Sequence, residues 1–374
     1  MQSRKIRVGM VGGGQGAFIG NVHRIAMRIS DQFDLCAACF SSDPARADAS
    51  AREQGIAAQR SYHDYAQMAQ LEAARDDGIE AVIVVTPNHL HFPIACAFLE
   101  LGMHVICDKP LSLDSAQAEH LIALSQRYGK QLWVTYNYTA YPMVREARAR
   151  ILRGDLGKIR SIQVEYSQDW LATALERDGQ KQASWRTDPK RAGAAGCLGD
   201  IGVHAFNLLQ YMTGLVPDRI AANLHSFVEG RVLDDHAQIW MRFAQGARAN
   251  LLCSQIAVGK ENYLRIQVFG EGGALDWCQE SPNHLMFSQL NGDTQRCSRA
   301  RHHSDPAVQA SCLIPAGHPE GYLEAFALLY RDIAAALRHE NVASNAHAAL
   351  RDMQFIEACL TSQKADNAWV DFPV

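Results

Sequence analysis

A glycine-rich turn near the N-terminus constrains the fold more than any other feature of the chain. The apolar residues 6–11 lead directly into the run Gly12-Gly13-Gly14-Gln15-Gly16-Ala17-Phe18-Ile19-Gly20. A strand, a glycine turn and a helix from about residue 21 open a dinucleotide-binding unit, because glycine lets the backbone approach a pyrophosphate and the helix N-terminus supplies N–H donors. We therefore expect a Rossmann domain here; the alternative is a merely flexible glycine turn.

The alternation of strands and helices continues over residues 1–138. Apolar strands are predicted at residues 6–11, 35–40, 81–85, 104–107 and 132–135. Helices are predicted between them at residues 22–29, 44–53, 62–74, 93–101 and 115–127. Strands that are apolar on both faces and separated by helices form a parallel sheet covered on both sides. Residues 1–138 are thus predicted to form one α/β domain.

Beyond residue 138 the period of the hydrophobic pattern changes. Apolar and polar residues alternate over 162–166 and again over 264–268. Period-two alternation indicates strands with one buried and one wet face, which are usually antiparallel. Residues 139–374 are therefore predicted to form an α+β domain built on an antiparallel sheet. The polar residues 291–312 lack such a pattern and are interpreted as a long surface loop.

Composition narrows the classes of function. At 374 residues, 48% of them hydrophobic, the chain can form about two domains with sizeable cores. A net charge of -4 gives no indication of a nucleic-acid or anionic-membrane partner. No apolar run could span a bilayer, and the first strand begins too early for a secretory signal. We expect a cytoplasmic protein whose ten cysteines are reduced thiols and not metal ligands.

A carboxylate, Asp200, and an imidazole, His204, stand four residues apart at the start of a predicted amphipathic helix. At this spacing the two groups can reach one substrate atom together. Asn207 and Tyr211 continue the same face, which suggests a polar cleft, and Gly214 is expected to end the helix. The alternative is an aspartate that interacts with the helix dipole and a histidine that only packs.

Two further polar turns follow predicted strands, Thr86-Pro87-Asn88-His89-Leu90-His91 and Cys107-Asp108-Lys109-Pro110. In an open α/β sheet, ligands bind outside the carboxyl ends of the strands, so both turns are expected to face a cofactor. With the glycine turn and the helix of Asp200, they make nearly the whole chain resemble the Gfo/Idh/MocA oxidoreductase family. The resemblance implies a Rossmann domain followed by an α+β domain with a large, mostly antiparallel open sheet. It also implies oxidation or reduction of sugars, polyols or related compounds with NAD(H) or NADP(H).

The resemblance assigns site residues in this chain. Asp108, Lys109 and Pro110 match the family's Glu-Lys-Pro motif, with aspartate in place of glutamate, and Asp200 and His204 match its Asp-x-x-x-His motif. The residues Gln15-Gly16-Ala17 look inserted into the family's glycine loop. The cofactor-binding residues implied in this way are Gly12, Gly14, Phe18, Ile19, Thr86, Asn88, His91, Asp108 and Lys109.

The expected chemistry follows from these residue types. Oxidation of a secondary alcohol needs a base for the hydroxyl proton, and a neutral imidazole suits that role near neutral pH, so His204 is the predicted acid/base. Lys109 is predicted to bond the reacting oxygen and to stabilise alkoxide charge. Asp200 is predicted to orient the imidazole or to hold a substrate hydroxyl. Further substrate-side candidates are Tyr136, Asn137, Trp170 and Arg186, although a surface role explains Arg186 equally well.

Cofactor choice is read at the end of the strand at 35–40. NAD-selective domains place an acidic residue there, but this chain has Ser41 and Ser42, with Arg46 one turn into the next helix. Serine and arginine can bind a 2′-phosphate. Asp43 precedes Pro44 and is interpreted as a helix N-cap; the alternative is that it turns toward the ribose, which would favour NAD(H). The sequence therefore favours NADP(H) over NAD(H).

The sequence is also compatible with two alternative functions, and it indicates that the chain associates with copies of itself. A hydrolase or lyase that uses a bound nicotinamide transiently would need the same residues, and a non-catalytic redox sensor would need only the cofactor site. The antiparallel sheet, with one face not covered by helices, is a candidate association surface. We expect a homodimer or homotetramer.

Overall fold

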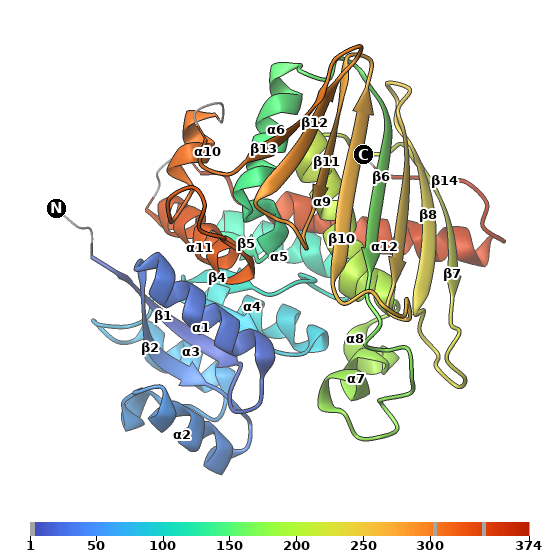
Figure 1. Ribbon diagram of the computed structural model, residues 1–374. Coiled ribbons are helices and arrows are strands. Elements are labelled where there is room, and N and C mark those ends of the chain that lie inside the picture. The colour runs from blue at the N-terminus through green and yellow to red at the C-terminus, as the bar shows by residue number, and fades with distance from the viewer. Residues whose placement is uncertain (1–3, 302–304, 339–341, 374) are drawn as a thin grey trace. The chain divides into compact units, whose positions relative to one another are not determined.

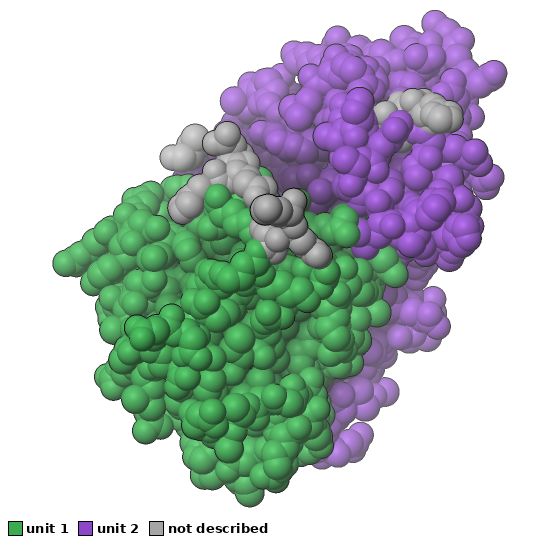
Figure 2. Space-filling view, turned by 90° about the vertical axis from the view of Figure 1, so that its left-hand side faces the viewer, with its two compact units in different colours: residues 1–137, 322–350 green, residues 138–321, 351–374 purple. Residues whose placement is uncertain are grey.

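A computed structural model describes residues 4–301, 305–338 and 342–373. The chain divides into two compact units, one of residues 1–137 and 322–350 and one of residues 138–321 and 351–374 (Figure 2). The helix α11 (Tyr322–Leu337) therefore belongs with the N-terminal unit, although it lies within the 139–374 stretch predicted as the second domain.

The first unit contains the predicted parallel sheet, in the order β2-β1-β3-β4-β5 (Figure 1). Its strands are β1 (Ile6–Gly12), β2 (Phe33–Cys39), β3 (Ala81–Val85), β4 (His104–Cys107) and β5 (Leu132–Val134). The helices between them are α1 (Phe18–Ser30), α2 (Pro44–Glu53), α3 (Tyr65–Ala73), α4 (His91–Glu100) and α5 (Ser115–Arg127). β2 pairs with one edge of β1, and the chain then crosses over so that β3 pairs with the other edge. The order of the strands therefore reverses between β1 and β3, and in open α/β sheets ligands bind at the carboxyl ends of the strands at such a switch point.

Aromatic contacts fix α11 on α1 within this unit. The Nδ1 atom of His23 lies 2.7 Å from the hydroxyl oxygen of Tyr330, and the rings of His23 and Phe326 meet edge to face at 5.2 Å. His23 is completely buried, and desolvation lowers its pKa to about 4. The start of α1, next to the glycine turn, is thus supported by a helix more than 300 positions away in the sequence.

The second unit contains a nine-stranded sheet in the order β13-β12-β11-β10-β6-β9-β8-β7-β14. Neighbouring strands are antiparallel except for β6 and β9, so the expected mostly antiparallel sheet is confirmed. The strands are β6 (Ile159–Ser167), β7 (Arg219–His225), β8 (His236–Arg242), β9 (Arg248–Ser254), β10 (Tyr263–Gly270), β11 (Gly273–Cys278), β12 (His284–Gln289), β13 (Thr294–Ser298) and β14 (Val370–Asp371).

The prediction of one long surface loop over residues 291–312 is wrong. The segment contains the edge strand β13, which pairs with β12, and the helix α10 (Pro306–Ala310). Three of the five residues of β13 are exposed, as an edge strand allows, so the strand carries no apolar alternation for the sequence to reveal. Residues 302–304 of the predicted loop lie outside the described residues.

Helices pack on one face of the large sheet. They are α6 (Pro142–Arg153), α9 (Val203–Thr213) and α12 (Ala346–Lys364), and two short helices, α7 (Lys181–Arg186) and α8 (Pro189–Ala192), precede α9. Phe206 of α9 stacks on Phe355 of α12 with 4.1 Å between ring centroids. Along β8, buried and exposed side chains alternate, so the opposite face of the sheet is open in the described part of the chain.

Several expectations about the chain as a whole can be compared with the described residues. All ten cysteines are free thiols, and six of them are buried. Among the described residues, no group of three or more His, Cys, Asp and Glu side chains is placed to hold a metal ion. Every described helix is too short or too polar to cross a lipid bilayer.

Candidate functional site

The glycine turn of the first unit has the backbone of a phosphate-binding loop. Gly12 has a φ of 81°, and a Cβ there would lie 2.8 Å from the carbonyl oxygen of Val85. Gly20, in the first turn of α1, approaches Gly13 so closely that a Cβ would lie 2.4 Å from its Cα. The N-cap of α1, Ala17, offers no side-chain hydrogen bond, so backbone N–H groups at this helix start are left for a ligand. These residues fit the pyrophosphate of a dinucleotide.

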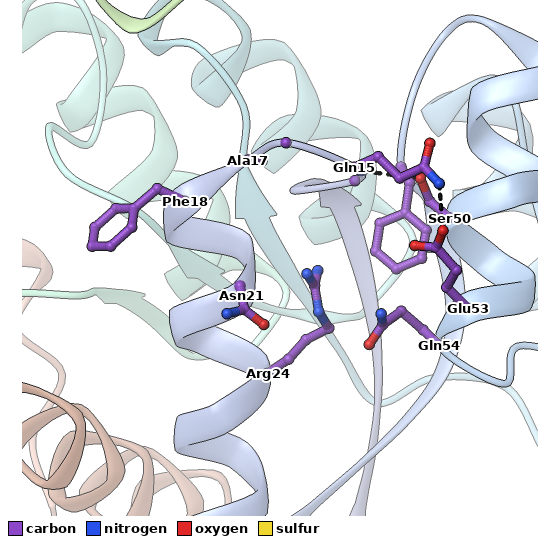
Figure 3. Close-up of a pocket in the computed structure, with 11 residues that line it drawn as sticks. Gln15, Ala17, Phe18, Asn21, Arg24, Ser50, Glu53 and Gln54 are labelled. Atoms are coloured by element: carbon purple, nitrogen blue, oxygen red, sulfur yellow. Dashed lines mark hydrogen bonds between the residues drawn. The ribbon is translucent and has the colours of Figure 1, made fainter.

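The inserted residues of the turn are attached to α2. The backbone N–H of Gln15 donates to Ser50 Oγ at 3.1 Å, and the Gln15 side-chain amide donates to Glu53 at 2.5 Å (Figure 3). Beneath the turn, Arg24 of α1 donates to the carbonyl of Gly13 at 2.7 Å. A hollow of about 520 Å³ opens here between the turn, α1 and α2, and its lining includes Asn21, Arg24, Phe40 and Gln54. No motif or spacing in the sequence singles out Arg24, Ser50 or Glu53.

The turns after β3 and β4 are joined by His91. This residue is buried, and its Nδ1 and Nε2 atoms lie 2.7 Å and 2.9 Å from the carbonyl oxygens of Pro110 and Thr86. Burial lowers the pKa of His91. Both ring nitrogens of this predicted cofactor residue lie at hydrogen-bond distance from backbone carbonyls, and the neutral imidazole donates its one N–H to one of them, so His91 packs between the turns of Asn88 and Lys109.

The strand ends carry the remaining predicted residues of the first unit. The Asp108 carboxylate accepts a 2.8 Å hydrogen bond from Thr135, which follows β5, and the peptide bond between the two residues after Asp108, Lys109–Pro110, is cis. Lys109 is half-buried at this turn. Tyr136 and Asn137 follow Thr135 and are both buried.

After the end of β2, the side chains of Ser41 and Asp43 form hydrogen bonds with the backbone at the start of α2. The Asp43 carboxylate accepts from the backbone N–H of Arg46 at 2.9 Å, which confirms Asp43 as the N-cap of α2. Ser41 Oγ accepts from the N–H of Asp43 at 3.1 Å. The side chains of Ser42 and Arg46 are exposed. The carboxylate that follows the end of β2 is therefore engaged in capping α2.

In the second unit, Asp234 holds the backbone that leads to Asp200 and His204. Its buried carboxylate accepts from the N–H groups of Gly196 and Leu198 at 2.6 Å and 2.8 Å. The chain then forms one π-helical turn (Leu198–Gly202) before α9 begins, so the helix starts with a wider turn than the sequence predicts. Gly214 ends α9 with a φ of 72°, as expected.

The predicted polar face of α9 is only partly a cleft. Asn207 is buried and donates to the Asp352 carboxylate at 2.8 Å, so it faces α12. The guanidinium of Arg148 lies over the ring of Tyr211, 4.8 Å from its centroid. The prediction of one continuous cleft-facing stripe fails because the buried Asn207 finds its partner within the core and the half-buried Tyr211 packs against Arg148.

Three predicted site residues of the second unit lie together. The Arg186 guanidinium is 3.2 Å from the Asp200 carboxylate, and it lies 4.3 Å and 5.9 Å from the ring centroids of Trp185 and Trp170. Gln255, which the sequence did not suggest, donates to the same carboxylate oxygen of Asp200 at 2.9 Å. Arg186 is thus an ion-pair partner of Asp200 that also contacts two indole rings, and its side chain is only 25% exposed.

The imidazole of His204 lies against buried tyrosines. Its ring meets that of Tyr138 at 5.0 Å and 85°, and His204 itself is 8% exposed. Tyr138 bonds Tyr166 through the two hydroxyl oxygens at 2.6 Å. The sequence suggested neither tyrosine, because their contacts join segments that are far apart in the chain. Together, these residues can position an imidazole against aromatic rings, four residues along the chain from the Asp200 carboxylate.

Comparison with known proteins gives two family matches and several close relatives. Residues 6–136 match the oxidoreductase family with an NAD-binding Rossmann fold, and residues 144–276 match the GFO/IDH/MocA C-terminal domain. The uncharacterized oxidoreductase YfiI of Bacillus subtilis is 33% identical, over 99% of this chain and 98% of its own length. The levoglucosan dehydrogenase of Pseudarthrobacter phenanthrenivorans is 26% identical, over 99% of both chains. An inositol dehydrogenase homolog from Azotobacter vinelandii, solved in complex with NAD+, is 35% identical with a TM-score of 0.95, over 99% of this chain and 98% of its own.

Proposed function

Because this chain belongs to the Gfo/Idh/MocA family of NAD-binding oxidoreductases, we propose that it transfers a hydride between a nicotinamide cofactor and a sugar, polyol or related secondary alcohol or ketone. The cluster of His204, Asp200, Arg186 and Trp170 at the start of α9 carries this proposal. A guanidinium and a carboxylate bond hydroxyl groups, and an indole face packs on the C–H face of a sugar ring. The levoglucosan dehydrogenase and the inositol dehydrogenase homolog are named for substrates of this class.

The chain's own residues supply the proton chemistry. His204 takes the hydroxyl proton in oxidation and returns it in reduction. Lys109 donates a hydrogen bond to the reacting oxygen and stabilises its negative charge. Asp200, whose carboxylate is held by Arg186 and Gln255, bonds a neighbouring substrate hydroxyl. When bound, the nicotinamide supplies the hydride acceptor or donor.

A substrate screen tests this function. The purified protein is incubated with sugars, inositols and other polyols, each with NAD+ and with NADP+, and absorbance of the reduced nicotinamide is followed. Net accumulation of reduced cofactor with a polyol is the expected result. Conversion of the substrate without net cofactor reduction would instead identify a hydrolase or lyase, and cofactor binding without turnover of any compound would favour a sensor.

We propose that the chain prefers NADP(H), although the Azotobacter protein was solved with NAD+. Asp43 is engaged as a helix cap, while Ser42 and Arg46 are exposed at the strand end. We expect NADP+ to bind more tightly than NAD+, and Arg46→Ala to weaken NADP+ binding by about tenfold through loss of one charged contact to phosphate. Titration calorimetry with both cofactors measures this. Tighter binding of NAD+ that Arg46→Ala leaves unchanged would overturn the preference.

The open face of the nine-stranded sheet is the proposed association surface. Trp240 of β8 is 44% exposed there, and a groove of about 400 Å³ runs along Gln238, Trp240, Asn250 and Leu252. We expect light scattering at micromolar concentration to give a homodimer or a dimer of dimers. Trp240→Asp should shift the protein toward monomer, because it replaces the exposed indole of this face with a charge. Leu152→Asp, at an exposed position of α6, is the control, and a wild-type monomer would contradict the proposal.

A further inference from the structure

A closed ring of three hydrogen bonds lies beside His204. The hydroxyl oxygens of Tyr138 and Tyr166 are 2.6 Å apart, and the Tyr166 hydroxyl donates to Asn262 Oδ1 at 2.8 Å. The Asn262 side-chain amide closes the ring with a 3.3 Å bond to the Tyr138 hydroxyl. Tyr138 and Tyr166 are buried, and Asn262 immediately precedes β10. The ring joins three segments of the second unit.

The direction of every bond in this ring is set by the indole of Trp170. An indole N–H can only donate, and it donates to Gln168 Oε1 at 3.1 Å. The Gln168 amide nitrogen must then be the donor to Asn262 Oδ1, at 2.7 Å, which fixes the orientation of the Asn262 amide. Tyr166 also donates to Asn262 Oδ1, so its one proton is used there, and Tyr138 must donate to Tyr166. Along the path from Trp170 through Gln168 and Asn262 to Tyr138, each side chain therefore donates a hydrogen bond to the next.

This polarity determines how Tyr138 meets His204. The hydroxyl proton of Tyr138 is directed at Tyr166, so Tyr138 presents its aromatic ring to the imidazole, at 5.0 Å between centroids. Tyr138 also stacks on Tyr141 with an interplanar angle of 6°. The hydrogen bonds to Tyr166 and Asn262 hold the Tyr138 hydroxyl, and Tyr141 packs on the Tyr138 aromatic ring. Tyr138 therefore gives the imidazole of His204 a fixed surface to pack on.

We propose that Asn262 is a positioning residue that acts through Tyr138 on the imidazole of His204 and through Gln168 on the indole of Trp170. The inference rests on the proposed function, in which His204 moves the proton and Trp170 lines the substrate site. In this proposal Asn262 acts on the imidazole and on the indole only through Tyr138 and Gln168. It joins the two ends of the network because it bonds Tyr138, Tyr166 and Gln168.

The test compares Asn262→Leu and Tyr138→Phe with Tyr62→Phe, which removes a buried hydroxyl bonded to Glu72 in the first unit. The first readout needs no substrate: histidine-labelled protein is studied by NMR, and the His204 ring signal is identified by its loss in His204→Gln. We expect both network variants to shift or broaden this signal and Tyr62→Phe to leave it in place. An unmoved signal in both network variants overturns the proposal, and Tyr138→Phe, which deletes one oxygen atom, decides the outcome if Asn262→Leu fails to fold.

The second readout is kinetic, with the polyol found in the substrate screen. We expect each network variant to lower kcat by about tenfold with an unchanged cofactor Kd, since small displacements of a catalytic group cost up to about 100-fold. The double variant should be no slower than the slower single variant, because the ring acts as a unit. Multiplicative losses, or wild-type kcat, would contradict the proposal. If His204→Ala retains wild-type turnover, the proposed function fails independently of the NMR result.

Discussion

We expect His204→Ala and Lys109→Ala each to lower kcat by about 10²–10⁴-fold, with cofactor Kd close to wild type, because each removes a positioned group that acts on the reacting oxygen or its proton. His204 is buried against Tyr138 at the start of α9. Lys109 is half-buried in the turn after β4, whose next residue, Pro110, is bonded by His91. The segments that carry His204 and Lys109 are therefore held in place by contacts with other residues.

Steady-state kinetics and cofactor titration on the same preparations measure these effects. Lys158→Ala, at an exposed position of the second unit, is the matched control for loss of a lysine. His204→Gln keeps a polar side chain of similar size and should be as slow as His204→Ala, because glutamine cannot take up the proton. Near wild-type turnover in both alanine variants would remove these residues from the mechanism.

We expect acid to destabilise the first unit through His23. Burial depresses the pKa of His23 from about 6.5 when unfolded to about 4 when folded, so only the unfolded chain takes up this proton between these two pH values. The stabilisation is fully present above about pH 6.5 and is lost as the pH falls toward 4. A shift of this size corresponds to about 3 kcal/mol of unfolding free energy. The lowered pKa of His91 adds in the same direction.

Urea unfolding at pH 7 and at pH 4.5 measures this effect in wild type and in His23→Phe. The phenylalanine ring keeps the aromatic contact with Phe326 and removes the titrating nitrogen. His23→Phe should lose stability at pH 7, where the bond to Tyr330 is gone, and should show a weaker pH dependence than wild type. His318→Gln removes an exposed imidazole and should follow wild type. Parallel pH dependences of His23→Phe and wild type would refute the assignment to His23.

The first sheet was largely predictable because its signals are local. The helices 44–53 and 115–127 have the predicted bounds, since Asp43 and Asp114 cap their N-termini with side-chain hydrogen bonds. The strands 81–85 and 104–107 also have the predicted bounds, as expected for apolar runs inside a parallel sheet. The start of α1 was predicted about three residues late, because Gly20, needed for close packing on Gly13, reads as part of the loop.

The site was predictable only where one short segment holds its residues. Asp200 and His204 stand four residues apart, and the Lys109 turn follows an apolar strand, so both could be selected. Gln255, Asn262 and Asp234 could not, because each acquires its role by pairing with a segment far away in the chain. Such pairs leave no periodic trace in one sequence. The edge strand β13 escaped prediction because, exposed and polar, it lacks the alternation of a half-buried strand.

The attachment of the glycine turn to α2 has a consequence for redesign of this protein. Gln15 ties the pyrophosphate turn to Ser50 and Glu53, and the same helix begins beside Ser42 and Arg46, the proposed readers of the ribose substituent. In the proposed binding mode, the segments that would contact the adenosine and diphosphate portions of the nucleotide are joined by these hydrogen bonds. We therefore expect substitutions of Arg46 that are intended to change cofactor choice to alter diphosphate binding as well. Libraries for such a conversion should vary Gln15 and Glu53 together with the residues at the end of β2.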